Sequence, residues 1–140
     1  MTIRVGDLWY CYYTAMPGML GAVYCRTSPD LVTWSEATIV AFGGSAETGA
    51  SSAECPFVVT HESGWLYLFR TQIYGESAHT SVYRSKDPMD FGVEDDQSLV
   101  CTLPIAAPEI ILYEGQYYVA CLLPSLKGIQ IARLNWVPRP

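Results

Sequence analysis

The chain has 140 residues, enough for one domain with a sizeable core, and half of them are hydrophobic. Charged residues make up only 16%, which excludes a disordered chain, and the net charge of -6 excludes the basic surface that a nucleic acid partner needs. The longest apolar runs are far shorter than the ~20 residues of a membrane span, so no membrane partner is expected.

The first predicted unit covers residues 1–50. An aromatic-rich strand over residues 8–13 follows the turn residue Gly6, and a second strand is predicted over residues 22–26. A turn-rich segment over residues 28–34 ends on Trp34, which can pack back onto the sheet. The later units open with a strand after a proline. The first unit has no such strand, so we expect it to lack its opening strand.

The second and third predicted units cover residues 51–104 and 105–140 and repeat the order of the first. Each opens with a strand that follows a proline, Pro56 in one and Pro108 in the other. Each continues with a turn glycine and an aromatic-rich strand, and then with a strand that contains an arginine. The order of strands is therefore the same in both units.

A repeat of about 50 residues with roughly four short strands per unit is typical of β-propeller blades. The sequence therefore predicts an all-β fold: one partial β-propeller domain of about three blades, each an antiparallel four-stranded sheet. We expect the recurring aromatic residues to fill blade interiors, and they are Trp9, Trp65, Tyr67 and Tyr118.

Candidate chemistry lies where the repeat is broken. Glu54 stands two residues before Pro56, whereas the equivalent position of the next unit is Ala106. The first strand of a propeller blade lines the central channel, so Glu54 is expected to point toward the mouth where ligands bind. Glu109 is a second channel-side candidate from the next blade. The alternative for Glu109 is a strand-start residue bonded to the backbone.

At these residues the chain resembles the five-bladed propeller glycosidases of glycoside hydrolase families 32 and 43. The resemblance rests on residues 28–34, 52–57, 64–71 and 83–88. It implies an acid/base glutamate, which maps onto Glu54, and two further catalytic aspartates that have no counterpart in this chain. Asp87 precedes a proline, but it follows a lysine and lies in a late-blade turn, so it is no substitute.

The resemblance implies that the protein acts on or binds a carbohydrate of the fructoside or arabinoside type, with Glu54 as a remnant acid/base. Glycosidic cleavage needs two carboxyl groups, so we expect little or no hydrolase activity from this chain alone. Arg70, Gln72 and Tyr74 are candidates for holding the sugar, with packing as the alternative role of each. The alternative function is a non-catalytic carbohydrate-binding or oligomerising propeller module.

No cofactor and no metal site are expected, because the two histidines stand alone and the five cysteines form no Cys-x-x-Cys pair. Most of the cysteines lie in or near apolar strands, so we expect buried, inert thiols. The N-terminus shows no secretion signal, which predicts a cytoplasmic protein. A partial propeller leaves blade faces uncovered, so we expect a homo-oligomer formed through these faces.

Overall fold

The structure is a computed structural model and describes residues 1–137. It contains three antiparallel sheets, with four, four and three strands. The strands of the first sheet are β1 (Thr2–Val5), β2 (Leu8–Ala15), β3 (Ala22–Ser28) and β4 (Thr38–Ala41). Those of the second are β5 (Glu54–Thr60), β6 (Leu66–Ile73), β7 (His79–Ser85) and β8 (Leu99–Leu103). Those of the third are β9 (Glu109–Tyr113), β10 (Gln116–Leu122) and β11 (Ile129–Leu134).

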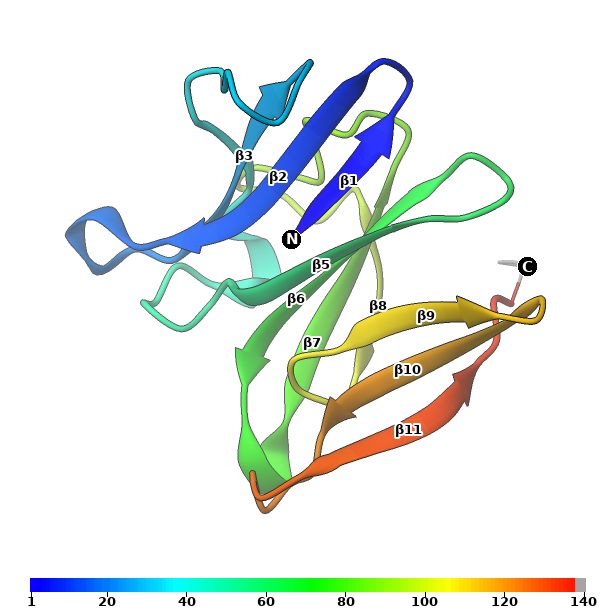
Figure 1. The fold of residues 1–140 in the computed structure, drawn as a ribbon. Helices are drawn as coiled ribbons and strands as arrows, with labels where there is room; N and C mark the ends of the chain where they lie inside the picture. Colours follow the sequence, from blue (N-terminus) through cyan, green and yellow to red (C-terminus); the bar gives the residue numbers. More distant parts are fainter. Residues whose placement is uncertain (138–140) are drawn as a thin grey trace.

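In every sheet, strands that are neighbours in the chain are neighbours in space. The sheets stand side by side in chain order, and β5 of the second sheet contacts both β2 and β9 (Figure 1). Three short 3-10 turns lie in the connections: η1 (Pro17–Met19), η2 (Gly44–Ala46) and η3 (Gly75–Ser77). The predicted all-β, blade-like architecture is confirmed, and no helix within residues 1–137 is long and apolar enough to cross a membrane.

The first sheet does have an opening strand, so the expectation that it lacks one was wrong. Strand β1 pairs with β2, with Arg4 opposite Trp9, through a tight turn in which Gly6 has a φ of 58°. Along β1, Ile3 and Val5 are half-buried and the residues between them are exposed. This strand was missed because no proline precedes it. The third sheet is the one with three strands among the described residues.

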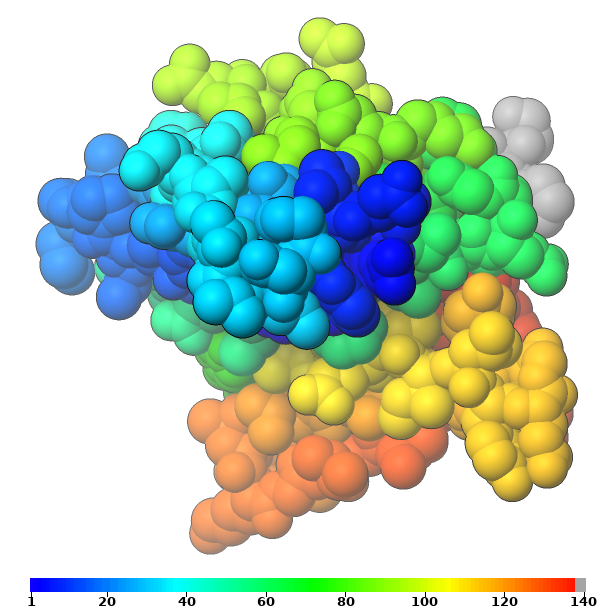
Figure 2. Space-filling view, turned by 45° about the horizontal axis from the view of Figure 1, so that its top comes forward, coloured from blue at the N-terminus to red at the C-terminus, as the bar shows by residue number. Residues whose placement is uncertain are grey.

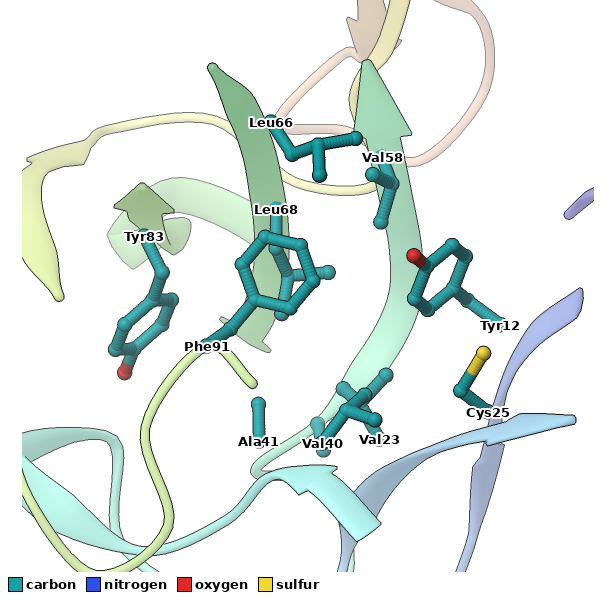
Figure 3. Close-up of a cluster of buried hydrophobic side chains, with 11 residues drawn as sticks. Tyr12, Val23, Cys25, Val40, Ala41, Val58, Leu66, Leu68, Tyr83 and Phe91 are labelled. Carbon is teal, nitrogen blue, oxygen red and sulfur yellow. The ribbon is translucent and has the colours of Figure 1, made fainter. Parts of the chain in front are cut away.

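The first two sheets pack face to face around the larger hydrophobic cluster. Tyr12 and Val23 come from the first sheet, and Val58 and Leu68 come from the second (Figure 3). The hydroxyl of Tyr12 donates a hydrogen bond to the carbonyl oxygen of Pro88 over 2.8 Å, which joins the two sheets by a polar contact as well. Full burial of such aliphatic side chains contributes roughly 1.5–3 kcal/mol each.

A smaller cluster joins the second sheet to the third. Its buried members are Phe69 and Val82 from the second sheet and Ile110 and Val119 from the third. Figure 2 shows the third sheet, coloured yellow to red, projecting below the mass formed by the first two. The opposite face of the third sheet is apolar yet exposed, with Ile129 at 65% and Ile131 at 64%.

Of the recurring aromatic residues expected in the sheet interfaces, Tyr67 packs against the cluster between the second and third sheets, but none of the four is fully buried. Trp9, Trp65, Tyr67 and Tyr118 are each only half-buried. The aromatic side chains that are fully buried in the interfaces are Tyr12, Phe69, Tyr83 and Phe91. Successive side chains of a strand point to opposite faces, so an aromatic-rich strand places only alternate rings in the core.

The cysteines also differ in their burial. Cys25 and Cys121 are buried, Cys11 is half-buried, and Cys55 and Cys101 are exposed. The expectation of buried thiols was therefore wrong for Cys55 and Cys101. Cys55 is exposed because it lies at an irregular point of β5, where side chains do not follow the strand alternation.

Candidate functional site

Glu54 is the first residue of β5 and lies opposite Thr71 of β6. The pairing is irregular between Glu54 and Phe57, and the backbone of Cys55 is left-handed, with a φ of 46°. A non-glycine residue in this conformation stores backbone strain, which persists only where the surrounding structure holds it. The strand start at Glu54 is therefore an irregular point of the β5–β6 pairing.

The start of the third sheet repeats this backbone. Ala107 precedes Pro108 as Cys55 precedes Pro56, and its φ is 49°. This correspondence makes Glu54 and Ala106 structurally equivalent, as the sequence repeat predicts. Ala106 is 1% exposed, whereas the longer side chain of Glu54 is half-buried. A carboxylate therefore stands at a position that the neighbouring sheet fills with a methyl group.

Tyr74 lies beside Cys55, the residue that follows Glu54. Its hydroxyl oxygen lies 3.3 Å from the sulfur of Cys55. Burial, followed by the neighbouring Cys55 and Glu54 side chains, raises the pKa of Tyr74 above its ordinary value. Tyr74 thus stays a neutral phenol that can donate a hydrogen bond at this end of the sheet.

Arg70 lies beneath the segment that leads to Glu54, with 1% of its surface exposed. Its guanidinium donates to the carbonyl oxygens of Ser52 at 2.6 Å, Glu47 at 2.9 Å and Gly43 at 3.2 Å. It also donates to the hydroxyl of Ser52 at 3.3 Å, and burial lowers the pKa of Arg70 below its ordinary value. These bonds fix residues 43–52, the connection from the first sheet to Glu54.

Gln72 faces a cavity of about 300 Å³ at the same end of the second sheet. Its amide nitrogen donates to the carbonyl oxygen of Arg70 at 2.6 Å, and its amide oxygen accepts from the hydroxyl of Ser81 at 3.2 Å. The polar residues lining the cavity are Ser45, Glu47, Ser51, Ser52, Gln72 and His79. The cavity has the size and polarity to hold one small hydrophilic group.

Two of these lining residues, Glu47 and His79, were missed by the sequence reasoning. Glu47 lies in the connection between the first two sheets and has a φ of 61°. His79 opens β7 and pairs with Ile73, which places it beside the end of β6. The only signal in the sequence is their place in turn segments next to Glu54 and Gln72, and that signal is shared with many other polar residues.

Glu109 is exposed at the start of β9, opposite Ala120 of β10. It begins the opening strand of its sheet just as Glu54 does, so both carboxylates lie at the same end of the strands. Among residues 1–137 no group of three histidine, cysteine or acidic side chains is placed to hold a metal ion.

Comparison with solved structures shows in which proteins this fold occurs. A glycoside hydrolase family 43 β-1,3-galactosidase matches this chain with a TM-score of 0.72 and 17% sequence identity. The match covers 96% of this chain and 31% of the galactosidase. The endo-arabinase of Bacteroides thetaiotaomicron matches with a TM-score of 0.62 and 10% sequence identity. This match covers 94% of this chain and 52% of the endo-arabinase. The Bombyx mori family 32 β-fructofuranosidase matches with a TM-score of 0.54 and 15% sequence identity. This match covers 86% of this chain and 28% of the fructofuranosidase.

No family model and no curated protein sequence matches the chain. The structural matches show the fold: the chain has the architecture of part of the five-bladed β-propeller found in glycoside hydrolases of families 43 and 32. The chain spans about a third of the length of the galactosidase and of the fructofuranosidase.

Proposed function

We propose that this chain is the part of a carbohydrate-active propeller that supplies the acid/base carboxylate, Glu54. The observation that carries the proposal is that Glu54 stands where the next sheet has Ala106. Two consecutive sheets share the same strained backbone before a proline, and only one of them has a carboxylate there. Backbone strain is often found at functional sites. Because both strained starts are present and only one has a carboxylate beside it, we infer a chemical role for Glu54.

The chemistry of glycoside hydrolysis requires a second carboxyl group. One protonates the leaving oxygen, and the other attacks the sugar or activates water across the ring. Proton transfer by Glu54 alone contributes about 10²–10⁴-fold. The chain covers 31% of the galactosidase, so we propose that the second carboxylate is supplied by a partner or by a further part of the protein. By itself the chain binds sugar and hydrolyses it slowly or not at all.

The polar cavity beside Gln72 is the proposed site for one sugar ring. The amide of Gln72, the imidazole of His79 and the carboxylate of Glu47 can hydrogen-bond to ring hydroxyls. Arg70 is proposed as a positioning residue, because its bonds hold the cavity wall in place. The β-fructofuranosidase of similar fold has been solved with sucrose, which supports a glycoside as the ligand class. Fructosides, arabinosides and galactosides are the candidates.

The test is release of a chromogenic leaving group from a panel of these three glycosides. Wild-type chain and Glu54→Gln are compared, with Glu36→Gln, a change at an exposed glutamate between β3 and β4, as the matched control. An acid/base role predicts that any turnover falls at least 100-fold in Glu54→Gln while sugar binding is retained. Measurable turnover in the wild type that is unchanged in Glu54→Gln would contradict the role of Glu54.

A second candidate function is an oligomerising module, which the outer face of the third sheet favours. Ile111, Tyr113, Ile129 and Ile131 are 45%, 62%, 65% and 64% exposed on this face. Contiguous apolar surface of this kind marks an interaction site. Light scattering would show a mass above 15.5 kDa for the wild type and a monomer for Ile131→Lys. A monomeric wild type at all concentrations rules this function out.

A further inference from the structure

A second and larger cavity, of about 820 Å³, lies between the second and third sheets. It is bordered by the β5–β6 turn, the β9–β10 turn and the segment that follows β11, which come together on the right of Figure 1. Glu54 begins β5, whereas this cavity lies where β5 ends. The cavity is therefore at the opposite end of the strands from the candidate active site.

Four aromatic rings form one wall of this cavity. The ring centre of Trp136 lies 4.3 Å from that of Tyr67, 5.2 Å from that of His61 and 5.5 Å from that of Tyr117. His61 and Tyr117 are themselves stacked at 5.9 Å. The rings come from both sheets and from the segment after β11, so the wall is held in place by the fold. Such a wall offers flat apolar faces to a ligand.

Trp136 also carries an unused hydrogen-bond donor. Its indole nitrogen is buried and has no hydrogen-bond partner among residues 1–137. Buried tryptophan N–H groups usually have a partner, and an exception calls for an explanation. A ligand oxygen in the cavity would satisfy this donor. The ligand must therefore present hydrogen-bond acceptors as well as an apolar face.

The remaining polar lining carries no net charge. The described residues of the cavity include one acid and one base, Glu62 and Arg84, and two amides, Gln116 and Asn135. Arg84 is in addition stacked on Trp65, with its guanidinium carbon 4.4 Å from the ring centre. With one acid and one base, the lining gives no net electrostatic attraction to an anion such as phosphate. A neutral ligand rich in hydroxyl groups fits both the amides and the rings.

We propose that this cavity is a second binding site for a short neutral oligosaccharide, formed by Tyr67, Tyr117 and Trp136 with Gln116 and Asn135. A volume of 820 Å³ lies within the range of roughly 300–1,000 Å³ that is usual for small-molecule sites. The site is independent of the proposed reaction at Glu54, because it needs no carboxylate chemistry and lies at the other end of the sheets. It would hold a substrate chain away from the point of cleavage.

The experiment is isothermal titration of the chain with arabinotriose, kestose and β-1,3-galactobiose. The central variant is Trp136→Phe, which removes the N–H donor and keeps an aromatic ring. The expected result is saturable binding of at least one probe, weakened about tenfold in Trp136→Phe because one buried donor is lost. Trp9→Phe, on the first sheet, is the matched control and keeps wild-type affinity.

Thermal melts check that Trp136→Phe is folded. Asn135→Ala changes an exposed residue of the cavity and is expected to weaken binding several-fold without changing the melting temperature. Glu54→Gln keeps this binding, so loss of turnover and loss of this site are separate results. The proposal is overturned by no saturable binding of any probe at millimolar concentration. It is equally overturned by binding that is lost in Glu54→Gln and unchanged in Trp136→Phe.

Discussion

The guanidinium of Arg70 donates a hydrogen bond to the carbonyl oxygen of Ser52 over 2.6 Å, two residues ahead of Glu54. A buried side chain of β6 thereby fixes the path of the chain into the start of β5. Glu54 and Gln72, at the neighbouring ends of β5 and β6, are half-buried. The position of the candidate acid/base carboxylate thus depends on a residue that is not itself accessible.

Arg70→Met is expected to destabilise the protein by about 3 kcal/mol, because it leaves buried carbonyl oxygens without a donor. Urea unfolding followed by circular dichroism measures this free energy of unfolding. Arg133→Met changes an exposed arginine of β11 and is expected to stay within about 0.5 kcal/mol of wild type. Similar unfolding midpoints for the two variants would contradict the positioning role of Arg70.

Gly44 and Gly6 form a matched pair for testing the connection that carries Glu47. Both have positive φ, at 65° and 58°. A Cβ at Gly44 would lie 2.5 Å from a carboxylate oxygen of Asp96, whereas a Cβ at Gly6 would meet nothing within 4 Å. Gly6→Ala is expected to cost about 1 kcal/mol from its backbone conformation.

Gly44→Ala is expected to cost at least twice as much as Gly6→Ala, because the new methyl group also displaces Asp96. The carboxylate of Asp96 accepts hydrogen bonds from the backbone nitrogen of Ser45 at 3.1 and 3.0 Å, and these would be lost. Unfolding in urea compares the two variants directly. If Gly44→Ala and Gly6→Ala are equally stable, the contact between Asp96 and this connection does not contribute to the free energy of unfolding.

Asp30 gives the fold a dependence on acidic pH. Backbone N–H groups of Thr33 and Val32 donate to its carboxylate and lower its pKa below 3.8. A carboxylate with a lowered folded-state pKa stabilises the protein above its ordinary pKa, and this stabilisation is lost as the pH falls through the folded value. The advantage of wild type over Asp30→Asn is therefore expected at neutral pH and is expected to shrink below pH 3.8. Urea midpoints of both proteins across this range measure it, and a constant difference would contradict it.

The thiols are expected to react at very different rates. Burial, with a smaller effect of Cys11, raises the pKa of Cys25 to about 12, whereas Cys55 is exposed beside Glu54. Only the thiolate reacts, so iodoacetamide is expected to modify Cys55 in the folded protein and to reach Cys25 only after unfolding. Peptide mass mapping at successive times shows the order. If Cys25 were modified as fast as Cys55 is, the interface between the first and second sheets would have to open readily.

The fold was predictable because it depends on a repeat. A proline lies near the start of β5 and directly before β9, and turn glycines and aromatic-rich strands recur at similar distances after it. The strands that were not located, β1, β4 and β8, have no proline directly before them and contain no aromatic residue. Which aromatic residues are buried was not predictable, because the face of each strand that points to its neighbour is set by packing between sheets.

The candidate site was predictable only in part. Glu54 stood out because Ala106 occupies the equivalent position, and each of the two is followed by a residue with a left-handed backbone, Cys55 and Ala107. The proposed contact residue Arg70 has its guanidinium bonded to the connection that leads to Glu54, which no local pattern reveals. Trp136 became a candidate only when rings from two sheets were found around it. Such groupings depend on contacts between residues far apart in the sequence.

The unequal interfaces between the sheets have a consequence for unfolding. The second sheet is covered on both faces, whereas the third is attached through the smaller cluster around Phe69 and Val119. In arrays of this kind each unit is stabilised mainly by its neighbours, and local opening follows the weakest interface. Amide hydrogens of β9 to β11 should therefore exchange with solvent sooner than those of β6, and heating should release the third sheet while the first two remain paired.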